Sequence, residues 1–265
     1  MKLSSSILTL DWASVAEKIK RFIKDYVEES GASGIVLGLS GGIDSSTAAA
    51  LSALAIGGEN VIGLMLPEIE TYNMNDIEDA KLVAKKFGLR TEILDITPAI
   101  KAFQNTIPIF DHNDKLCKGN LKARVRMIFL YYYANKFNLL VCGSSDKSEV
   151  MIGYFTKWGD SAADIAPLMS LYKTQVRKLA EYIGVPGKIV NKPSTPSLWP
   201  GQTAEGEIGI KYEILDLILY GLEHSMSTEE IAEQLNLDKS IVESVKEKIH
   251  LAEHKRKIPP TVKIQ

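Results

Sequence analysis

Short apolar runs alternate with helical patterns over residues 35–143, and this alternation constrains the fold more than any other feature of the sequence. The runs expected to form buried strands are 35–39, 61–66, 91–96 and 139–143. The stretches expected to form helices between them are 46–56, 76–87 and 121–137. Because parallel strands are joined by crossover helices, this order predicts an α/β fold, a doubly wound parallel sheet with helices on both faces. In such a sheet, ligands bind beyond the carboxyl ends of the strands.

Helical patterns also flank this region. Apolar residues recur at three- and four-residue spacing over residues 12–26, which predicts an amphipathic N-terminal helix that Gly31 ends. Residues 228–249 have the rhythm of a helix-turn-helix module, but their mixed charges favour a packed C-terminal helical appendage over a DNA-binding regulator. We expect one domain over residues 1–265, with a core at about 32–200 and a C-terminal helical segment at about 205–265.

Composition and charge exclude several classes of protein. The net charge of −2 gives no general attraction to nucleic acid or to anionic membranes, so we expect neither as a partner, and any phosphate site must be built locally. The apolar run near the N-terminus is short and is interrupted by Asp11, which is too little for a secretory signal or a membrane span. We therefore expect a cytoplasmic protein. Cys117 and Cys142 lack metal-site spacing, and Cys142 is interpreted as a buried strand residue rather than a nucleophile.

A glycine-rich loop, residues 38–46, follows the first expected strand and leads into a helix. Gly41 and Gly42 allow the backbone to approach phosphate oxygens closely, the serines supply hydroxyls, and the helix N-terminus favours an anion. Asp44 fits such a place if it holds Mg²⁺ beside a polyphosphate. A glycine loop alone could be a tight turn, but this one is neither a Walker A loop nor a GxGxxG fingerprint.

The pattern Ser-Gly-Gly-x-Asp-Ser in this loop resembles the pyrophosphate loop of the ATP pyrophosphatases, a Rossmann-like superfamily that cleaves ATP between the α and β phosphates. Residues 143–160, GSSDKSEVMIGYFTKWGD, are similar to the signature of the NAD synthetases within that superfamily. The other segments that resemble this family are 122–127, 171–176, 192–203 and 254–260. The chain departs from the family pattern at Ser144, where members commonly carry Thr, near Thr195, and at residues 67–75, whose contacts the resemblance leaves open.

The resemblance implies a ligase that amidates nicotinic acid adenine dinucleotide (deamido-NAD) with ammonia. ATP would be consumed through an acyl adenylate to give AMP and pyrophosphate, with Mg²⁺ as cofactor. Family members form homodimers, and the apolar faces of the N-terminal helix and of a helix at residues 211–221 are candidates for the interface. Glutamine-dependent relatives carry an additional amidase domain, for which motifs running from Gly38 to Lys257 leave no room, so ammonia is the expected nitrogen source.

Transferred position by position, the resemblance also implies roles for residues. The expected catalytic residues are Asp44, Glu149 and Lys173, of which Asp44 and Glu149 would bind the metal. The residues expected to bind ATP are Gly38, Leu39, Ser40, Gly41, Gly42, Ile43, Asp44, Ser45, Ser144, Lys173 and Thr195. The residues expected to bind deamido-NAD are Arg124, Lys157, Asp164, His254 and Lys255. Two polyanions that bind side by side require several positive charges nearby, and these basic residues would supply them.

Other functions compete with this interpretation. Another adenylating ligase of the same superfamily, similar to GMP synthetase or to the tRNA-modifying enzymes, is the main alternative, although a tRNA enzyme would normally be more basic. Residues 250–254, HLAEH, match the HxxEH pattern of some zinc peptidases, but so short a motif recurs by chance. The proline-rich run 193–200 could be a PxxP ligand, yet its neighbours favour a loop on the substrate side of the site.

Overall fold

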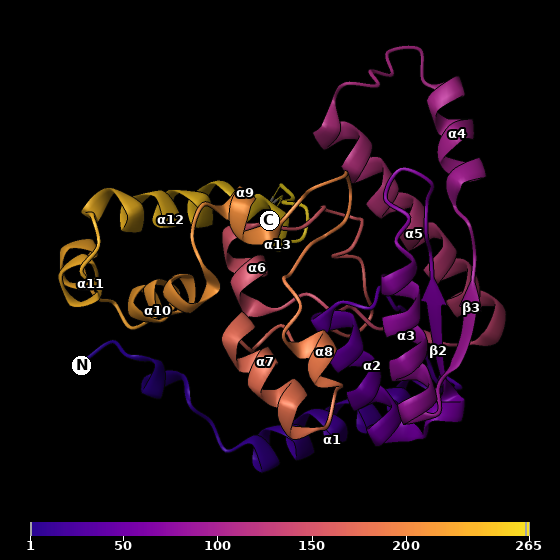
Figure 1. Ribbon diagram of the computed structural model, residues 1–265, viewed down its shortest axis with the longest axis horizontal. Coiled ribbons are helices and arrows are strands. Elements are labelled where there is room, and N and C mark those ends of the chain that lie inside the picture. Colours follow the sequence, from indigo (N-terminus) through magenta and orange to yellow (C-terminus); the bar gives the residue numbers. More distant parts are fainter. Residues whose placement is uncertain (1, 263, 265) are drawn as a thin grey trace.

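A computed structural model describes residues 2–262 and 264 and contains a four-stranded parallel sheet in the order β3-β2-β1-β4 (Figure 1). The strands are β1 (Ile35–Gly38), β2 (Val61–Met65), β3 (Arg90–Ile93) and β4 (Leu140–Val141). Ile35 on the central strand β1 is paired with Val61 on one side and with Leu140 on the other. A parallel bridge between Cys142 and Ile165 continues the sheet beyond β4. The predicted parallel sheet is confirmed.

Helices cover both faces of this sheet, as predicted. On one face, β1 and β2 side chains pack against α1 (Trp12–Ser30), α2 (Ile43–Ile56), α3 (Met74–Phe87), α7 (Lys173–Tyr182) and α8 (Gly187–Val190). On the other face, Val36, Ile62 and Leu64 pack against α4 (Thr97–Thr106) and α5 (Lys115–Phe137). Alternate residues of β1 and β2 therefore enter opposite apolar cores, as expected for strands buried on both sides.

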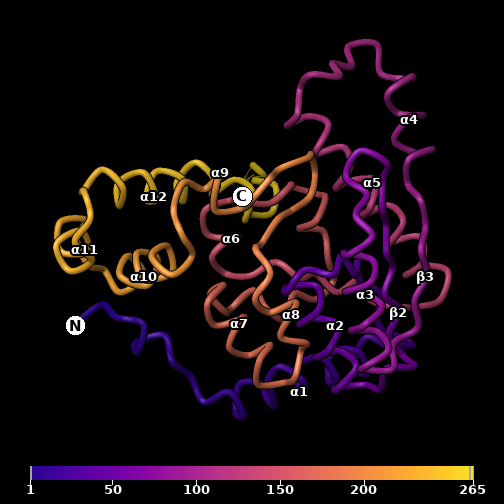
Figure 2. Tube along the Cα trace, viewed as in Figure 1, coloured from indigo at the N-terminus to yellow at the C-terminus, as the bar shows by residue number. Residues whose placement is uncertain are grey.

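The C-terminal helices form a second apolar core beside the sheet domain (Figure 1). The elements that contribute to it or adjoin it are η1 (Ser5–Leu8), α6 (Lys147–Ile152), α9 (Ala204–Ile208), α10 (Tyr212–Glu223), α11 (Thr228–Leu235), α12 (Lys239–Leu251) and α13 (Glu253–Arg256). Leu3 and Leu8 pack into this core, so the beginning of the chain runs along the C-terminal helices (Figure 2). Helices α11 and α12 pack on α10, which agrees with the predicted appendage.

Several predicted boundaries differ from the structure. The helix expected from Ser46 begins at Ile43, because the glycine loop already closes at the N-cap Gly42. The strand expected over 91–96 is shorter in the structure and ends at Ile93, although Leu94 and Ile96 still donate backbone hydrogen bonds to Met65 and Pro67 before α4 begins at Thr97. The short 3-10 turn η2 (Gly58–Asn60) precedes β2. The predicted stop of the first helix is confirmed, since Gly31 has φ 66°.

The two surfaces proposed from sequence for an interface have different environments. The apolar face of α10 is buried in the second core, and among its residues Tyr212, Leu215 and Ile218 are fully buried. Helix α1 buries Ile19 and Ile23 but leaves the aromatic side chains of Phe22 and Tyr26 exposed. The α10 expectation is therefore wrong, because an apolar helix face that packs inside the protein is not available to a partner. Within the described residues no helix is both long and apolar enough to cross a bilayer.

Candidate functional site

The glycine-rich loop between β1 and α2 has a geometry suited to an anion. Gly41 has φ +77°, and a Cβ atom there would lie 2.3 Å from the backbone oxygen of Asp76, so a larger residue does not fit. The Ser40 and Ser45 hydroxyls lie 3.0 Å apart across the loop. Gly42, the N-cap of α2, has no side chain to cap the helix, which leaves N–H groups of the first turn free to bind oxygen atoms.

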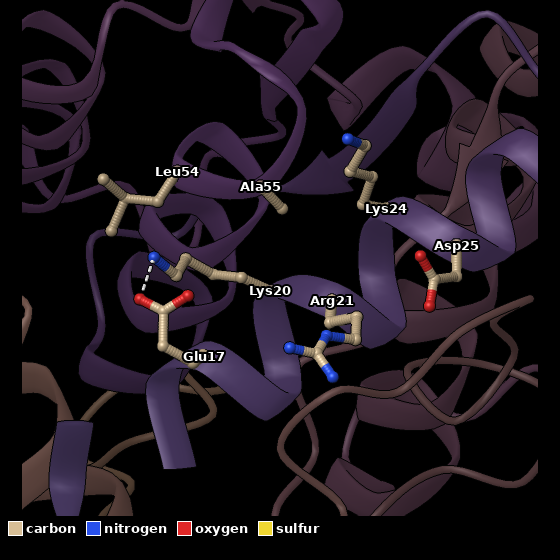
Figure 3. A pocket seen from close by; sticks show the side chains of 7 residues that line it. All are labelled: Glu17, Lys20, Arg21, Lys24, Asp25, Leu54 and Ala55. Atoms are coloured by element: carbon tan, nitrogen blue, oxygen red, sulfur yellow. Dashed lines mark ion pairs between the residues drawn. The ribbon is translucent and has the colours of Figure 1, made fainter. Parts of the chain in front are cut away.

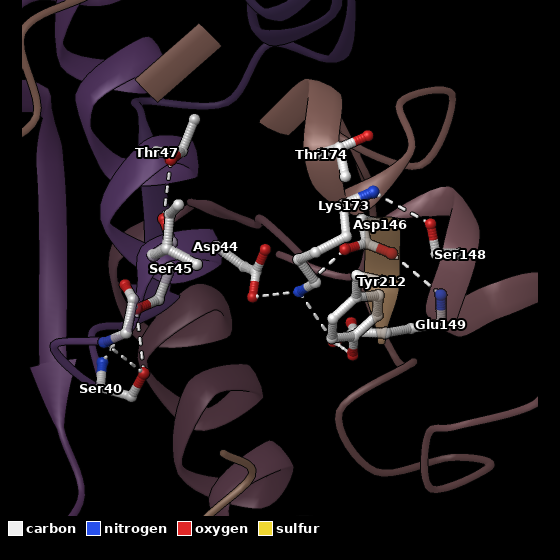
Figure 4. Close-up of polar contacts among 12 residues, drawn as sticks. Ser40, Asp44, Ser45, Thr47, Asp146, Ser148, Glu149, Lys173, Thr174 and Tyr212 are labelled. Carbon is white, nitrogen blue, oxygen red and sulfur yellow. Dashed lines mark hydrogen bonds and ion pairs between the residues drawn. The ribbon is translucent and has the colours of Figure 1, made fainter. Parts of the chain in front are cut away.

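The strand order places this loop beside the segment that follows β4. Because β1 lies between β2 and β4, the chain leaves the two neighbouring strands β1 and β4 in opposite directions, and a crevice opens between them. Asp44 enters this crevice from α2, Glu149 from α6 and Lys173 from the start of α7 (Figure 4). The three residues predicted to be catalytic are thus brought together from distant parts of the sequence.

Lys173 is the centre of this cluster. Its side chain is fully buried, and its Nζ lies 2.6 Å from Asp44 Oδ2, 2.8 Å from Asp146 Oδ2 and 2.8 Å from Glu149 Oε1 (Figure 4). Burial alone would lower the pKa of Lys173, but the three carboxylates outweigh it and hold this pKa well above its ordinary value. Lys173 therefore carries a fixed positive charge beside the phosphate loop.

The carboxylates of the cluster outnumber its cation. Burial raises the pKa of Asp146 to about 6, and burial together with the charge of Asp146 raises the pKa of Glu149 to about 8. Oxygen atoms of Asp44, Asp146 and Glu149 all lie within 4.8 Å of one another, and Asp44 Oδ1 is buried without a hydrogen-bond partner. Clustered carboxylate oxygens with an unsatisfied member are suited to a hard divalent cation such as Mg²⁺.

A second layer of polar contacts fixes Lys173 and its surroundings. The fully buried Asp216 accepts hydrogen bonds from the Ser148 hydroxyl at 2.6 Å and from the Thr174 hydroxyl at 2.7 Å. Ser148 Oγ in turn accepts the backbone N–H of Lys173 at 2.9 Å, and the Tyr212 hydroxyl lies 3.3 Å from Glu149 Oε1 (Figure 4). These contacts hold the start of α7 against α6 and α10.

Sequence reasoning did not assign Asp146, Ser148, Asp216 or Tyr212. Asp146 had a visible signal, since a carboxylate three residues before Glu149 is typical of a helix N-cap, and its Oδ1 does accept the Glu149 N–H at 2.9 Å. Asp216 also had a signal, as a carboxylate within the apolar run of α10. Burial of such a group requires polar partners, so it marks a polar contact inside the protein.

A cavity of about 840 Å³ adjoins the cluster and is lined by most of the residues predicted to bind substrates. From the phosphate loop they are Gly38, Leu39, Ser40, Gly42, Ile43, Asp44 and Ser45. From elsewhere they are Arg124, Ser144, Glu149, Lys157, Thr195, His254 and Lys255. Gly41 and Lys173 lie behind this wall, where they support the loop and the carboxylates.

The basic residues predicted for the dinucleotide lie where three segments meet. Arg124 on α5 donates to the backbone oxygen of Lys157 at 3.1 Å, and Lys157 Nζ donates to the backbone oxygen of His254 at 2.8 Å. Lys255 Nζ donates to the backbone oxygens of Gly153 and Phe155, each at 2.6 Å. Asp164 lies outside the cavity lining, where it accepts the Val141 N–H at 2.7 Å and so fastens the end of β4.

Other candidate features carry no chemistry. A smaller hollow of about 380 Å³ between α1 and α2 has mixed charges, with Lys20 paired to Glu17 at 2.5 Å (Figure 3). Its lining residues are Glu17, Lys20, Arg21, Lys24, Asp25, Leu54 and Ala55. The HxxEH match straddles the break between α12 and α13, and the metal-type cluster found among the described residues contains no histidine.

Comparison with known proteins agrees with this geometry. A family model described as NAD synthase matches residues 15–259. The chain belongs to the NAD synthase family. It is 50% identical over 252 residues to the NH(3)-dependent NAD(+) synthetase of Methanocaldococcus jannaschii, an alignment that covers 94% of this chain and 96% of that protein.

Two solved structures share both fold and sequence with this member of the NAD synthase family. NMN synthetase from Francisella tularensis has a TM-score of 0.84 at 33% identity, covering 96% of this chain and 99% of that one. The NH3-dependent NAD synthetase of Campylobacter jejuni, in complex with the nitrate ion, has a TM-score of 0.81 at 31% identity, covering 96% and 100%. The predicted family and fold class are confirmed.

Proposed function

We propose that the chain amidates the nicotinate carboxylate of deamido-NAD with ammonia, consuming ATP and releasing NAD, AMP and pyrophosphate. The observation that carries this proposal is the meeting of Asp44 from the phosphate loop with Glu149 at the wall of one large cavity, where the buried Lys173 contacts both carboxylates from behind. The relative from Methanocaldococcus jannaschii bears the corresponding name. The similar protein from Francisella tularensis is an NMN synthetase, so amidation of the nicotinate mononucleotide is the second candidate function.

The reaction needs an activated carboxylate, because a free carboxylate is a poor electrophile. A carboxylate oxygen attacks the α-phosphorus of ATP, the bond from that phosphorus to the bridging β-phosphate oxygen breaks, and pyrophosphate leaves. Ammonia then attacks the carbonyl carbon of the acyl adenylate, loses a proton, and AMP departs with the original carboxylate oxygen. The N–H groups of the phosphate loop and the fixed charge of Lys173 would stabilise the negative charge that develops on pyrophosphate.

Mg²⁺ fits the acidic cluster, and Asp44 and Glu149 are the residues that would hold it. Asp44 Oδ1 is a buried oxygen without a partner, while Lys173 occupies the other oxygen of this carboxylate. When bound, the ion would neutralise phosphate oxygens as a Lewis acid. Asp146 has a different role in this proposal, since its Oδ1 caps α6 and its Oδ2 contacts Lys173.

Transfer of oxygen tests the adenylate step. With deamido-NAD labelled by ¹⁸O in its nicotinate carboxylate, we expect one labelled oxygen in the AMP product and none in pyrophosphate, because the carboxylate forms the bond to the α-phosphorus. Mass spectrometry of AMP and pyrophosphate after turnover with ammonium measures this transfer. Unlabelled AMP, or formation of ADP and phosphate, would contradict the mechanism.

Glutamine should not replace ammonia for the purified chain. Hydrolysis of glutamine through a cysteine requires a reactive thiolate. Burial raises the pKa of Cys142 to about 12, and a hydrogen bond to Asp114 raises the pKa of Cys117. NAD formation should therefore be seen with ammonium and be absent with ammonia-free glutamine at the same concentration. Release of glutamate at the rate of NAD formation would refute this expectation.

We also propose that the chain is a single domain that forms a homodimer in the cytoplasm. Tyr172 and Ile152, which follow the sheet in sequence, pack into the C-terminal core, so the two parts share side chains. Ile128 and Tyr132 lie one turn apart on α5 and are 50% and 68% exposed, which makes this helix a better candidate for the dimer contact than α10.

A further inference from the structure

A second buried lysine lies behind the cavity wall, apart from the cluster around Lys173. The side chain of Lys122 on α5 is 1% exposed, and that of Glu68 beside it is 3% exposed. Lys122 Nζ lies 2.5 Å from Glu68 Oε1, 2.8 Å from Glu70 Oε2 and 2.9 Å from the backbone oxygen of Leu198. A buried ammonium is costly unless its charge and its three donors are matched, and here they are.

These contacts join three segments that are far apart in sequence. Glu68 and Glu70 belong to the loop 66–73 between β2 and α3, and Leu198 belongs to the segment 192–203. Residues of α5, of this loop and of this segment all line the large cavity, whereas Lys122 and its two carboxylate partners do not. Lys122 therefore connects three walls of the cavity from behind, out of reach of a substrate.

The loop 66–73 is organised around the same carboxylates. Glu68 accepts the Glu70 N–H at 3.1 Å through Oε2 and the Thr71 hydroxyl at 3.0 Å through Oε1. Glu70 also accepts a hydrogen bond from Lys118, at 3.0 Å. The hydrogen bond from Lys122 holds the pKa of Glu70 below its ordinary value. The turn of the loop thus depends on the charge that Lys122 supplies.

On the other side, Lys122 holds the turn that carries Thr195. Both backbone polar groups of Leu198 are hydrogen-bonded, because its N–H donates to Gln202 Oε1 at 2.8 Å while its carbonyl accepts from Lys122. The Thr195 hydroxyl donates to the Gln202 backbone oxygen at 2.7 Å and accepts the Ser197 N–H at 3.1 Å. The orientation of Thr195, a cavity residue, is therefore linked to Lys122 through this turn.

Close packing adds to the link. A Cβ atom at Gly119, one turn before Lys122 on α5, would lie 3.0 Å from the Trp199 ring and 3.2 Å from Leu198 Cβ. The absence of a side chain at Gly119 lets the helix approach the segment closely enough for the Lys122 ammonium to reach the Leu198 carbonyl.

We propose that Lys122 is a positioning residue that holds the loop 66–73 and the turn 195–202 in one arrangement and thereby sets the ATP-binding geometry of the cavity. Only the effect on ATP binding rests on the proposed function. The coupling of the two segments is a property of the free protein and is tested without substrate.

The first measurement is hydrogen exchange of the ligand-free protein. In Lys122→Met we expect the Glu70 and Leu198 amides to exchange faster together, each by about tenfold, the size expected when a bond to a charged group is lost. Lys118→Met is the matched control, since Lys118 lies on the same helix and contacts the same Glu70 but not Leu198. Faster exchange of only one of the two amides in Lys122→Met, or equal changes at Leu198 in Lys118→Met, would overturn the coupling.

The second measurement separates KM from kcat at a temperature where each variant is folded. Lys122→Met should raise KM for ATP by about tenfold and change KM for the nicotinate substrate by less than about twofold. The reason is that the substitution displaces Thr195, which is expected to bind ATP. Glu70→Gln, a partly exposed and isosteric change, should give a smaller rise in KM for ATP and keeps the test open if Lys122→Met does not fold. An unchanged KM for ATP in the folded variants would refute the positioning role, whereas absence of turnover in the wild type would instead refute the proposed function.

Discussion

Replacement of Lys173 by Met is expected to lower kcat by about two to three orders of magnitude. The variant loses the fixed positive charge beside the phosphate loop, and the three carboxylates that surround it lose their common partner. Steady-state rates of NAD formation at saturating ATP measure the effect. Lys178→Met, on the exposed side of the same helix, is the matched control and should retain wild-type rates.

The same replacement should also lower stability. Removal of one member of a buried ion cluster costs about 3–5 kcal/mol, because the remaining charges are left without compensation. For a chain of this size such a loss lowers the unfolding temperature by about 10 °C. Thermal unfolding followed by circular dichroism measures the shift, and kinetics are recorded well below it. Wild-type turnover in a folded Lys173→Met protein would show that this charge takes no part in the reaction.

Asp44→Asn and Glu149→Gln are each expected to lower kcat by about two orders of magnitude or more while the protein remains folded. Each change is isosteric and removes one charged ligand of the proposed Mg²⁺ site. It also relieves part of the excess negative charge around Lys173, so a large loss of stability is not expected. Asp25→Asn serves as the control, because this exposed carboxylate of α1 lines the smaller hollow and not the cavity beside Asp44. Near-normal activity of either folded variant would exclude its carboxylate as a metal ligand.

Metal binding can be followed without turnover. Added Mg²⁺ should raise the unfolding temperature of the wild type, because a cation that binds only the native state stabilises it. The rise should be absent or much smaller in Asp44→Asn. An equal rise in both proteins would show that Mg²⁺ stabilises the fold at some other place.

Local patterns in the sequence were sufficient for the elements and for the phosphate loop. Alternation of apolar runs and helices predicted the parallel sheet. Gly41 and Gly42 marked a tight turn, and at Gly41 the backbone and its neighbours leave room only for glycine. Boundaries were less certain where helix and strand signals compete, as at residues 91–96, where a strand of four residues gives way to α4. Local propensity specifies the type of an element, helix or strand, more accurately than the residue at which the element ends.

Contacts between distant segments were beyond such patterns. Asp44 and Lys173 are separated by 129 positions, and only the order β3-β2-β1-β4 brings them together. The resemblance to a family assigned roles to these two residues, but it assigned none to Asp216, which orients the start of α7, or to Lys122, although Lys122 begins a segment that resembles the family. The partners of a buried charge depend on how the helices pack on the sheet, and local sequence patterns do not show this packing.

Asp164 illustrates the opposite case. The resemblance implies that this residue binds deamido-NAD, whereas in the structure its carboxylate accepts hydrogen bonds from the Val141 backbone and, at 3.3 Å, from the Tyr131 hydroxyl. A contact with substrate stays a prediction. Asp164→Asn distinguishes the two roles, because a purely structural contact would change stability and leave KM for the dinucleotide unaltered.

Product analysis shows which acceptor the chain amidates and how it consumes ATP. The purified chain is incubated with ATP, Mg²⁺ and ammonium, and separately with deamido-NAD, the nicotinate mononucleotide, xanthosine monophosphate or tRNA as acceptor, and the products are identified by mass spectrometry. We expect NAD, AMP and pyrophosphate in equal amounts with deamido-NAD, and no reaction with xanthosine monophosphate or tRNA. Amidation of the mononucleotide alone would retain the chemistry and reassign the substrate. Formation of ADP and phosphate, or no amidation of either nicotinate nucleotide, would refute the proposed function.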